Sequence, residues 1–153
     1  PWLHGVAAAL ARGALLLIDY GLPRRQCYHP TQAAGTVRCY FRHRQHAEPL
    51  WHPGLTDITA SVDFTALAEA GVSAGFKLAG YCSQSSFLLH NGLAEYIAGV
   101  EGNPDEVSRY RENQHIKKLV MPGEMGERFQ VMGFARDVEF SAAFLLGDQT
   151  WRL

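Results

Sequence analysis

The chain has 153 residues, of which 47% are hydrophobic and 19% are charged, and its formal net charge is -1. This length and hydrophobic fraction suit one buried core and exclude a disordered chain. The charge excludes a polycation that binds nucleic acid with its whole surface. No apolar run approaches the roughly 20 residues of a membrane-spanning helix.

The first elements predict a strand that ends at a site. Residues 4–11 form the last turns of a helix, which Gly13 ends. Residues 14–18 are apolar on both alternating faces, a pattern typical of a central strand in a parallel sheet with helices on both sides. The strand stops at Asp19-Tyr20-Gly21. Because the chain has no initiator Met and opens inside a helix, we expect a piece of a longer protein.

A long connection leads to a second strand. Residues 21–53 are rich in Pro and Gly and predict a loop, with a short strand at residues 37–41. Residues 62–70 predict a helix with Ser61 or Asp63 as its N-cap and Gly71 past its end, and residues 76–82 a strand. This order predicts a βαβ unit.

The second half predicts two helices before the last strand. Residues 85–98 are helical in pattern with an interruption at Asn91-Gly92, and residues 103–106 combine cap, proline and acids as a helix start. That second helix extends to about Leu119. Two elements remain: a strand at residues 129–134, and a short strand or helical turn at residues 140–146.

Three acids are candidates for chemistry. Ligands of open α/β sheets bind beyond the carboxyl ends of the strands, so Asp19 and the segment from Asp57 to Asp63 are expected to face one crevice. Carboxylates there could act as general bases or orient a substrate amine or guanidinium. Structural roles compete with these: Asp63 as a helix cap, Asp57 in an Asx turn, and Asp19 as a turn cap.

The long connection is basic. Residues 20–47 contain no Asp or Glu, and their arginines predict an acidic or anionic partner: Arg24, Arg25, Arg38, Arg42 and Arg44. Aromatic residues lie among them, as in RNA-binding surfaces, but no RNP or KH pattern accompanies them, so a solvated loop is favoured over nucleic-acid binding.

Metal, nucleotide and disulfide motifs are not supported. Six zinc-capable residues crowd the same region: Cys27, His29, Cys39, His43, His46 and His52. No C-x-x-C spacing exists and the arginines oppose a dication, so no metal site is predicted. The sequence has no Walker lysine and no G-x-G-x-x-G. Three cysteines without framework spacing favour free thiols and an intracellular protein.

Several motifs in order carry a family resemblance. They are Leu15 to Gly21, Gly35-Thr36-Val37-Arg38, Pro53 to Phe64, Gln84 with Phe87-Leu88-Leu89, and Met125 to Val131. With these motifs the chain resembles the MidA family of class I S-adenosylmethionine-dependent methyltransferases.

The resemblance implies a Rossmann-like α/β fold with a seven-stranded sheet. Residues 1–153 would be the C-terminal part of a single methyltransferase domain. They would supply strands five to seven (residues 14–19, 76–82 and 129–134, the last antiparallel) and a helical insertion at approximately 84–122. The cofactor, S-adenosylmethionine, would be held by a glycine-rich loop and an acid that lie before Pro1, so this chain alone is expected to be inactive.

The resemblance also implies a reaction and roles for residues. Mitochondrial relatives are arginine methyltransferases in the assembly of respiratory complex I. The implied partners are therefore a protein substrate, such as a complex I subunit, and the remainder of the chain's own domain. The implied compartment is the bacterial cytoplasm or the mitochondrial matrix.

Within the implied site, Asp57 and Thr59 would position the substrate, Asp19 and Tyr20 would form the floor, and Asp63 would be a further carboxylate. Arg38 and His43 would contact the partner. Ser61 stands where the family is expected to have His. Two alternatives remain open: a non-catalytic assembly module that binds a partner with the arginine-rich loop, and an RNA methyltransferase.

Overall fold

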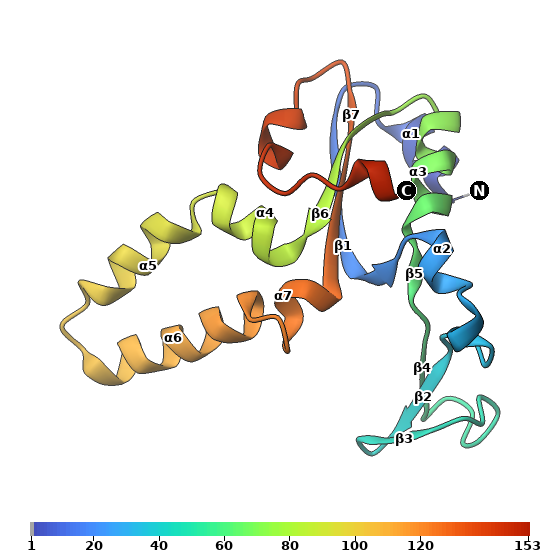
Figure 1. The fold of residues 1–153 in the computed structure, drawn as a ribbon, viewed down its shortest axis with the longest axis horizontal. Coiled ribbons are helices and arrows are strands. Elements are labelled where there is room, and N and C mark those ends of the chain that lie inside the picture. Colours follow the sequence, from blue (N-terminus) through green and yellow to red (C-terminus); the bar gives the residue numbers. More distant parts are fainter. Residues whose placement is uncertain (1) are drawn as a thin grey trace.

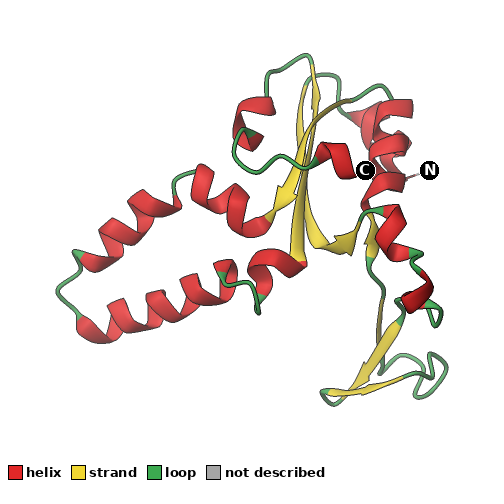
Figure 2. Cartoon of the chain, in the orientation of Figure 1, coloured by secondary structure: helices red, strands yellow, loops and turns green. Residues whose placement is uncertain are grey.

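The structure is a computed structural model that describes residues 2–153. A four-stranded sheet with the order β5-β1-β7-β6 forms its centre, and a three-stranded sheet, β3-β2-β4, projects from one end (Figures 1 and 2). The strands are β1 (Gly13–Leu22), β2 (Arg38–Phe41), β3 (Arg44–His46), β4 (Asp57–Thr59), β5 (Val62–Asp63), β6 (Lys77–Ser83) and β7 (Phe129–Arg136). The α-helices are α1 (Trp2–Ala9), α2 (Arg24–Cys27), α3 (Phe64–Ser73), α4 (Gln84–His90), α5 (Leu93–Glu101), α6 (Glu106–Val120) and α7 (Met125–Arg128). Short 3-10 helices are η1 (Pro30–Gln32), η2 (Ser141–Phe144) and η3 (Thr150–Arg152).

The two faces of the central sheet are covered by different elements. Helices α1 and α3 pack on one face, where Phe64, Phe76 and Phe134 belong to the largest buried cluster. On the other face, η2 and α4 cover β6 and β7, and Phe144 packs on Val131. Period-two alternation in β7 explains this division, because consecutive residues point to opposite faces.

Helices α5 and α6 form a hairpin that extends away from the sheet (Figure 1). Leu93, Val100 and Ile116 make a small core between the two helices. The predicted interruption between α4 and α5 is confirmed, since Gly92 adopts φ 100° there. The predicted start of α6 is confirmed within two residues, and Asp105 is its N-cap. Whether residues 84–122 are an insertion stays a prediction.

The prediction of a parallel sheet at residues 14–18 is wrong. Strand β1 pairs antiparallel with β7 from Gly13 to Tyr20 and parallel with β5 only at Gly21 and Leu22. β6 is also antiparallel to β7, so β1 and β6 run in the same direction with β7 between them. An apolar run indicates burial but not the direction of its neighbour, which comes here from more than a hundred residues further along the chain.

The prediction that helices cover β1 on both faces is also wrong for the described residues. Leu15 and Leu17 pack on the main core, while Leu16 is 38% exposed and Ile18 is 50% exposed. Leu16 and Ile18 lie on the face of the sheet that is packed by η2 and α4. These two elements cover β6 and β7 but do not reach β1. Residues 2–153 therefore leave one apolar face of β1 open.

The connection predicted as loop contains more structure than expected. It holds the end of β1, the short helices α2 and η1, and strands β2 and β3, of which β2 was predicted. The helix expected at residues 62–70 begins later, at Phe64, because Val62 and Asp63 pair with β1, and it runs through Gly71 to Ser73. Within residues 140–146, Ser141–Phe144 form the helical turn η2.

Candidate functional site

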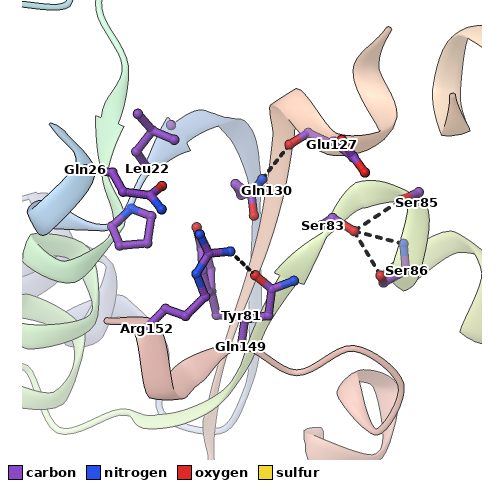
Figure 3. A pocket seen from close by; sticks show the side chains of 12 residues that line it. Leu22, Gln26, Tyr81, Ser83, Ser85, Ser86, Glu127, Gln130, Gln149 and Arg152 are labelled. Atoms are coloured by element: carbon purple, nitrogen blue, oxygen red, sulfur yellow. Dashed lines mark hydrogen bonds between the residues drawn. The ribbon is translucent and has the colours of Figure 1, made fainter. Parts of the chain in front are cut away.

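Two adjoining cavities lie at the end of the central sheet where β1 and β6 both finish. The inner cavity, of about 410 Å³, is lined by the end of β1, the end of β6, α4 and the C-terminal segment (Figure 3). The outer cavity, of about 730 Å³, lies between the end of β1, the small sheet and α7. They share Gly21, Leu22 and Glu127. Strand ends are the edge where open α/β sheets bind ligands.

Gly21 is required where the two cavities meet. A Cβ built on Gly21 would lie 2.3 Å from the carbonyl oxygen of Val62 and 2.8 Å from the ring of Phe64. Only glycine lets the end of β1 approach β5 this closely. The Asp-Tyr-Gly motif thus ends in a residue that packing demands.

Tyr81 forms the wall of the inner cavity on β6. The side chain is 1% exposed and packs against Phe64 with ring centroids 5.2 Å apart. Burial raises the pKa of Tyr81 to about 12. The phenol therefore keeps its proton at neutral pH and can serve as a hydrogen-bond donor rather than as a base.

A group of serines follows Tyr81 at the start of α4. Ser83 is the N-cap of this helix and accepts a hydrogen bond from the amide of Ser86 at 3.2 Å. Its hydroxyl also contacts the hydroxyls of Ser85 at 3.1 Å and Ser86 at 2.9 Å (Figure 3). Hydroxyls can both donate and accept, so this wall is polar and uncharged.

The C-terminal segment completes the inner cavity. The amide of Gln149 donates to the carbonyl of Tyr81 at 2.7 Å, and Asp148 accepts from the amide of Tyr81 at 3.1 Å. These bonds hold Gln149 and Arg152 beside β6. The Arg152 guanidinium donates to Oε1 of Gln149, which fixes one cation on this side of the cavity (Figure 3).

Three of the residues predicted for the site line the outer cavity: Tyr20, Arg38 and Thr59. Arg38 and Thr59 are directly opposite each other on β2 and β4. Tyr20 packs edge-on against Phe129 with centroids 5.6 Å apart, and burial, followed by Asp19 and Tyr40, raises the pKa of Tyr20. Ser61 lies in the same wall.

The other predicted residues lie elsewhere. Asp19 is exposed, and its carboxylate accepts from the amide of Tyr20 at 2.8 Å. Asp57 is exposed at the start of β4 and lines neither cavity. His43 lies in the two-residue turn between β2 and β3 with φ 62°, away from both cavities.

Asp63 has a structural role. One carboxylate oxygen accepts from the amide of Ala66 at 2.9 Å as the N-cap of α3, and the other is 3.2 Å from Nε of Arg24. Both oxygens are therefore engaged within the protein. Catalytic roles for Asp19, Asp57 and Asp63 stay predictions.

Sequence reasoning gave no site role to the polar residues of the inner cavity. Tyr81 and Ser83 could have been found, because they end the second predicted strand and the strand-end rule that selected Asp19 applies to them equally. Glu127 and Gln130 could not be found in this way, since they precede and begin an antiparallel strand. Arg152 lies in a 3-10 turn that gives no periodic signal.

Residues 2–153 contain no cluster of three or more His, Cys, Asp or Glu side chains that could hold a metal ion. Cys27, Cys39 and Cys82 are buried free thiols. Burial raises the pKa of Cys82 to about 12, so its thiol is not a nucleophile at neutral pH. No helix in this part of the chain is long and apolar enough to cross a membrane.

Curated proteins and solved structures resemble the chain. It is 33% identical over 118 residues to the mitochondrial protein arginine methyltransferase NDUFAF7 of Danio rerio and 33% identical over 122 residues to that of Homo sapiens. These alignments cover 77% and 79% of the chain but 26% of each relative. The chain thus spans about a quarter of the length of these relatives.

Two crystal structures of proteins from Burkholderia thailandensis are similar over 99% of the chain, each with 43% identity. One is a native structure with a TM-score of 0.92, of which 41% is covered. The other is bound to S-adenosyl-homocysteine, with a TM-score of 0.91 and 39% covered. The shared arrangement includes the edge of the sheet that carries the two cavities.

The family model described as "putative S-adenosyl-L-methionine-dependent methyltransferase" matches residues 1–82, which contain β1, the small sheet, α3 and most of β6. This is the class of protein that the MidA resemblance predicted. The chain belongs to this family of S-adenosylmethionine-dependent methyltransferases.

Proposed function

We propose that the protein of which these residues form a part transfers a methyl group from S-adenosylmethionine to an arginine side chain of another protein. The observation that carries the proposal is the double cavity at the strand ends, whose inner part is polar, in a fold with a TM-score of 0.91 to a structure bound to S-adenosyl-homocysteine. The arginine methyltransferase relatives, at 33% identity, support arginine as the acceptor.

The cavities of this chain do not fit the cofactor. Dinucleotide and nucleoside sites of this fold type use a glycine-rich turn at a helix N-terminus and an acid at a strand end. Among residues 2–153, the cavity walls carry neither: the β1 end leads through Pro23 into a four-residue helix, and the β6 end through Ser83 into α4. We assign the cofactor to the glycine-rich loop and acid expected before residue 1, outside the described residues.

The open side of β1 supports a larger sheet. From Gly13 to Tyr20, β1 pairs only with β7 among the described strands, and Leu16 and Ile18 are exposed on one face. Long apolar strand edges are rarely left uncovered in native proteins. We propose that further strands of a seven-stranded methyltransferase sheet pair with this edge and bring the cofactor to the two cavities.

In this arrangement the residues described here hold the methyl acceptor. Tyr81 and the serines of α4 offer neutral hydrogen bonds in the inner cavity, and Tyr20 with Thr59 shapes the outer one. Arg38 and Arg128 line the outer cavity and have no ion-pair partner in the described chain, which suits acidic residues of a protein substrate.

The implied partner is a complex I subunit, in a bacterial cytoplasm or a mitochondrial matrix. The mitochondrial relatives and the Burkholderia structures support these two settings. The partner is a proposal that rests on the MidA resemblance, and the site residues are proposals that rest on the lining of the two cavities.

The test uses the full-length protein. Calorimetry should show binding of S-adenosylmethionine, and incubation with the labelled cofactor and a proteome lacking the enzyme should label arginine side chains of a protein. Cofactor binding without any transfer would favour the non-catalytic assembly module, and label on RNA would favour an RNA methyltransferase. Absence of cofactor binding would refute the enzyme.

A further inference from the structure

We propose that Glu127 and Gln130 form the subsite that receives the guanidinium group of the acceptor arginine. This inference rests on the proposed function and adds the residues that recognise the acceptor. It is carried by the geometry where α7 joins β7, at the boundary of the two cavities (Figure 3).

Glu127 supplies the negative charge. Among the acidic residues of the described chain, only Glu127 lines the inner or the outer cavity, and it lines both. Its carboxylate has no ion-pair partner within residues 2–153. Asp63, in contrast, is engaged by Arg24 and by the cap of α3. The available carboxylate of the cavities is thus on α7.

Gln130 supplies a neutral acceptor beside it. Its side chain is 9% exposed, and its amide nitrogen donates to the main-chain carbonyl of Glu127 at 2.7 Å. A carbonyl can only accept, so this bond fixes which amide atom faces Glu127. The remaining atom, Oε1, has no hydrogen bond within the described chain and points into the inner cavity (Figure 3).

The backbone that carries this pair is held by packing. Gly126 is buried, and a Cβ on it would lie 2.1 Å from the carbonyl oxygen of Val120 at the end of α6. The amide of Gly126 also donates to the carbonyl of Met121 at 3.2 Å. The turn before Glu127 therefore has little freedom, which fixes the position of the Glu127 main chain at the cavity, while its side chain is exposed.

A guanidinium matches this set of acceptors. It is planar, always charged and has five N–H donors that point in different directions, so it can bind both a carboxylate and an amide carbonyl that line one cavity. The hydroxyls of Ser83, Ser85 and Ser86 lie in the same cavity and can accept further N–H groups. Arg152 is the cation of the inner cavity, and its partner Gln149 is neutral. The negative charge of Glu127 therefore offsets the charge of Arg152 and lowers the cost of bringing a second cation into the cavity.

The test is a titration of the full-length protein with N-acetyl-L-arginine amide, with and without S-adenosyl-homocysteine, followed by calorimetry or NMR. N-acetyl-L-citrulline amide is the comparison probe, because a neutral ureido group replaces the guanidinium with nearly the same shape. We expect the wild type to bind the arginine probe at least about tenfold more tightly than the citrulline probe, as loss of a charge-assisted bond predicts.

Two variants locate this preference. Glu127→Gln should remove the preference for arginine and raise the KM for the protein acceptor about tenfold, while cofactor affinity is unchanged. Gln130→Met should weaken the arginine probe about threefold. Glu124→Gln is the matched control, since Glu124 is exposed three residues earlier and lines neither cavity.

Equal binding of the two probes by the wild type overturns the inference without any variant. Unchanged arginine affinity in a folded Glu127→Gln protein also overturns it. If instead the wild type binds the arginine probe through Glu127 but transfers no methyl group, the proposed function fails and the subsite stands.

Discussion

Replacement of Asp63 separates a structural acid from a catalytic one. Asp63→Ala removes the N-cap of α3, a bond of 2.9 Å to Ala66, and the contact of 3.2 Å with Arg24. Loss of an N-cap costs about 1 kcal/mol, and a partly exposed ion pair is worth about 0.2–1 kcal/mol. Arg24 keeps its two bonds to Glu69, at 2.8 and 2.7 Å, so it is not left unpaired. We expect Asp63→Ala to lower the free energy of unfolding by about 1–2 kcal/mol.

Asp63→Asn is the informative companion variant. Asn is as good an N-cap as Asp, so only the charge toward Arg24 is lost, and we expect a loss below about 1 kcal/mol. Urea denaturation of the full-length protein measures both values, and methyl transfer is assayed on the same preparations. The structural account predicts that Asp63→Asn keeps most of the wild-type turnover. A folded Asp63→Asn protein without transfer would refute this reasoning and return Asp63 to the catalytic role predicted from the sequence.

Three further predictions concern packing, protonation and the open strand. Gly71→Ala places a Cβ 2.2 Å from the ring of Phe134, so urea denaturation should show a loss of about 1–3 kcal/mol. The pKa of Tyr81 is about 12 in the folded protein and 10.0 in the reference state. Between these pH values the folded state binds more protons than the unfolded state, so the free energy of unfolding should fall as pH rises. The fall should be less steep in Tyr81→Phe, and thermal melts across pH 9–12 measure it. Ile18→Asp should destabilise the full-length protein by about 3 kcal/mol or more if further parts of the larger domain cover this face; a change within about 0.5 kcal/mol would mean that Ile18 stays as exposed as it is here.

Much of the secondary structure could be predicted from the sequence because its signals are local. The three apolar runs became β1, β6 and β7, and Asn91-Gly92 marks a true break because Gly92 needs a positive φ. The order of the strands could not be predicted, since the pairing of β1 with β7 joins residues far apart in the chain. No local pattern encodes which strand returns between two others.

The site could be predicted in part for the same reason. The strand-end rule led to the edge of the sheet that carries the two cavities, and Tyr20, Arg38 and Thr59 line one of them. The rule does not say which face a side chain takes, so Asp19, next to Tyr20, points out of the cavity wall. An acid just before a helix can be either a catalytic group or the N-cap of that helix. In this structure Asp63 is the N-cap of α3.

The central claim is tested most directly by mass spectrometry of proteins after incubation of the full-length enzyme with isotope-labelled S-adenosylmethionine. The account predicts labelled methyl groups on arginine side chains of a protein substrate, with labelling reduced in Glu127→Gln and retained in Glu124→Gln. Cofactor binding without label on any protein, or label on RNA alone, would contradict it.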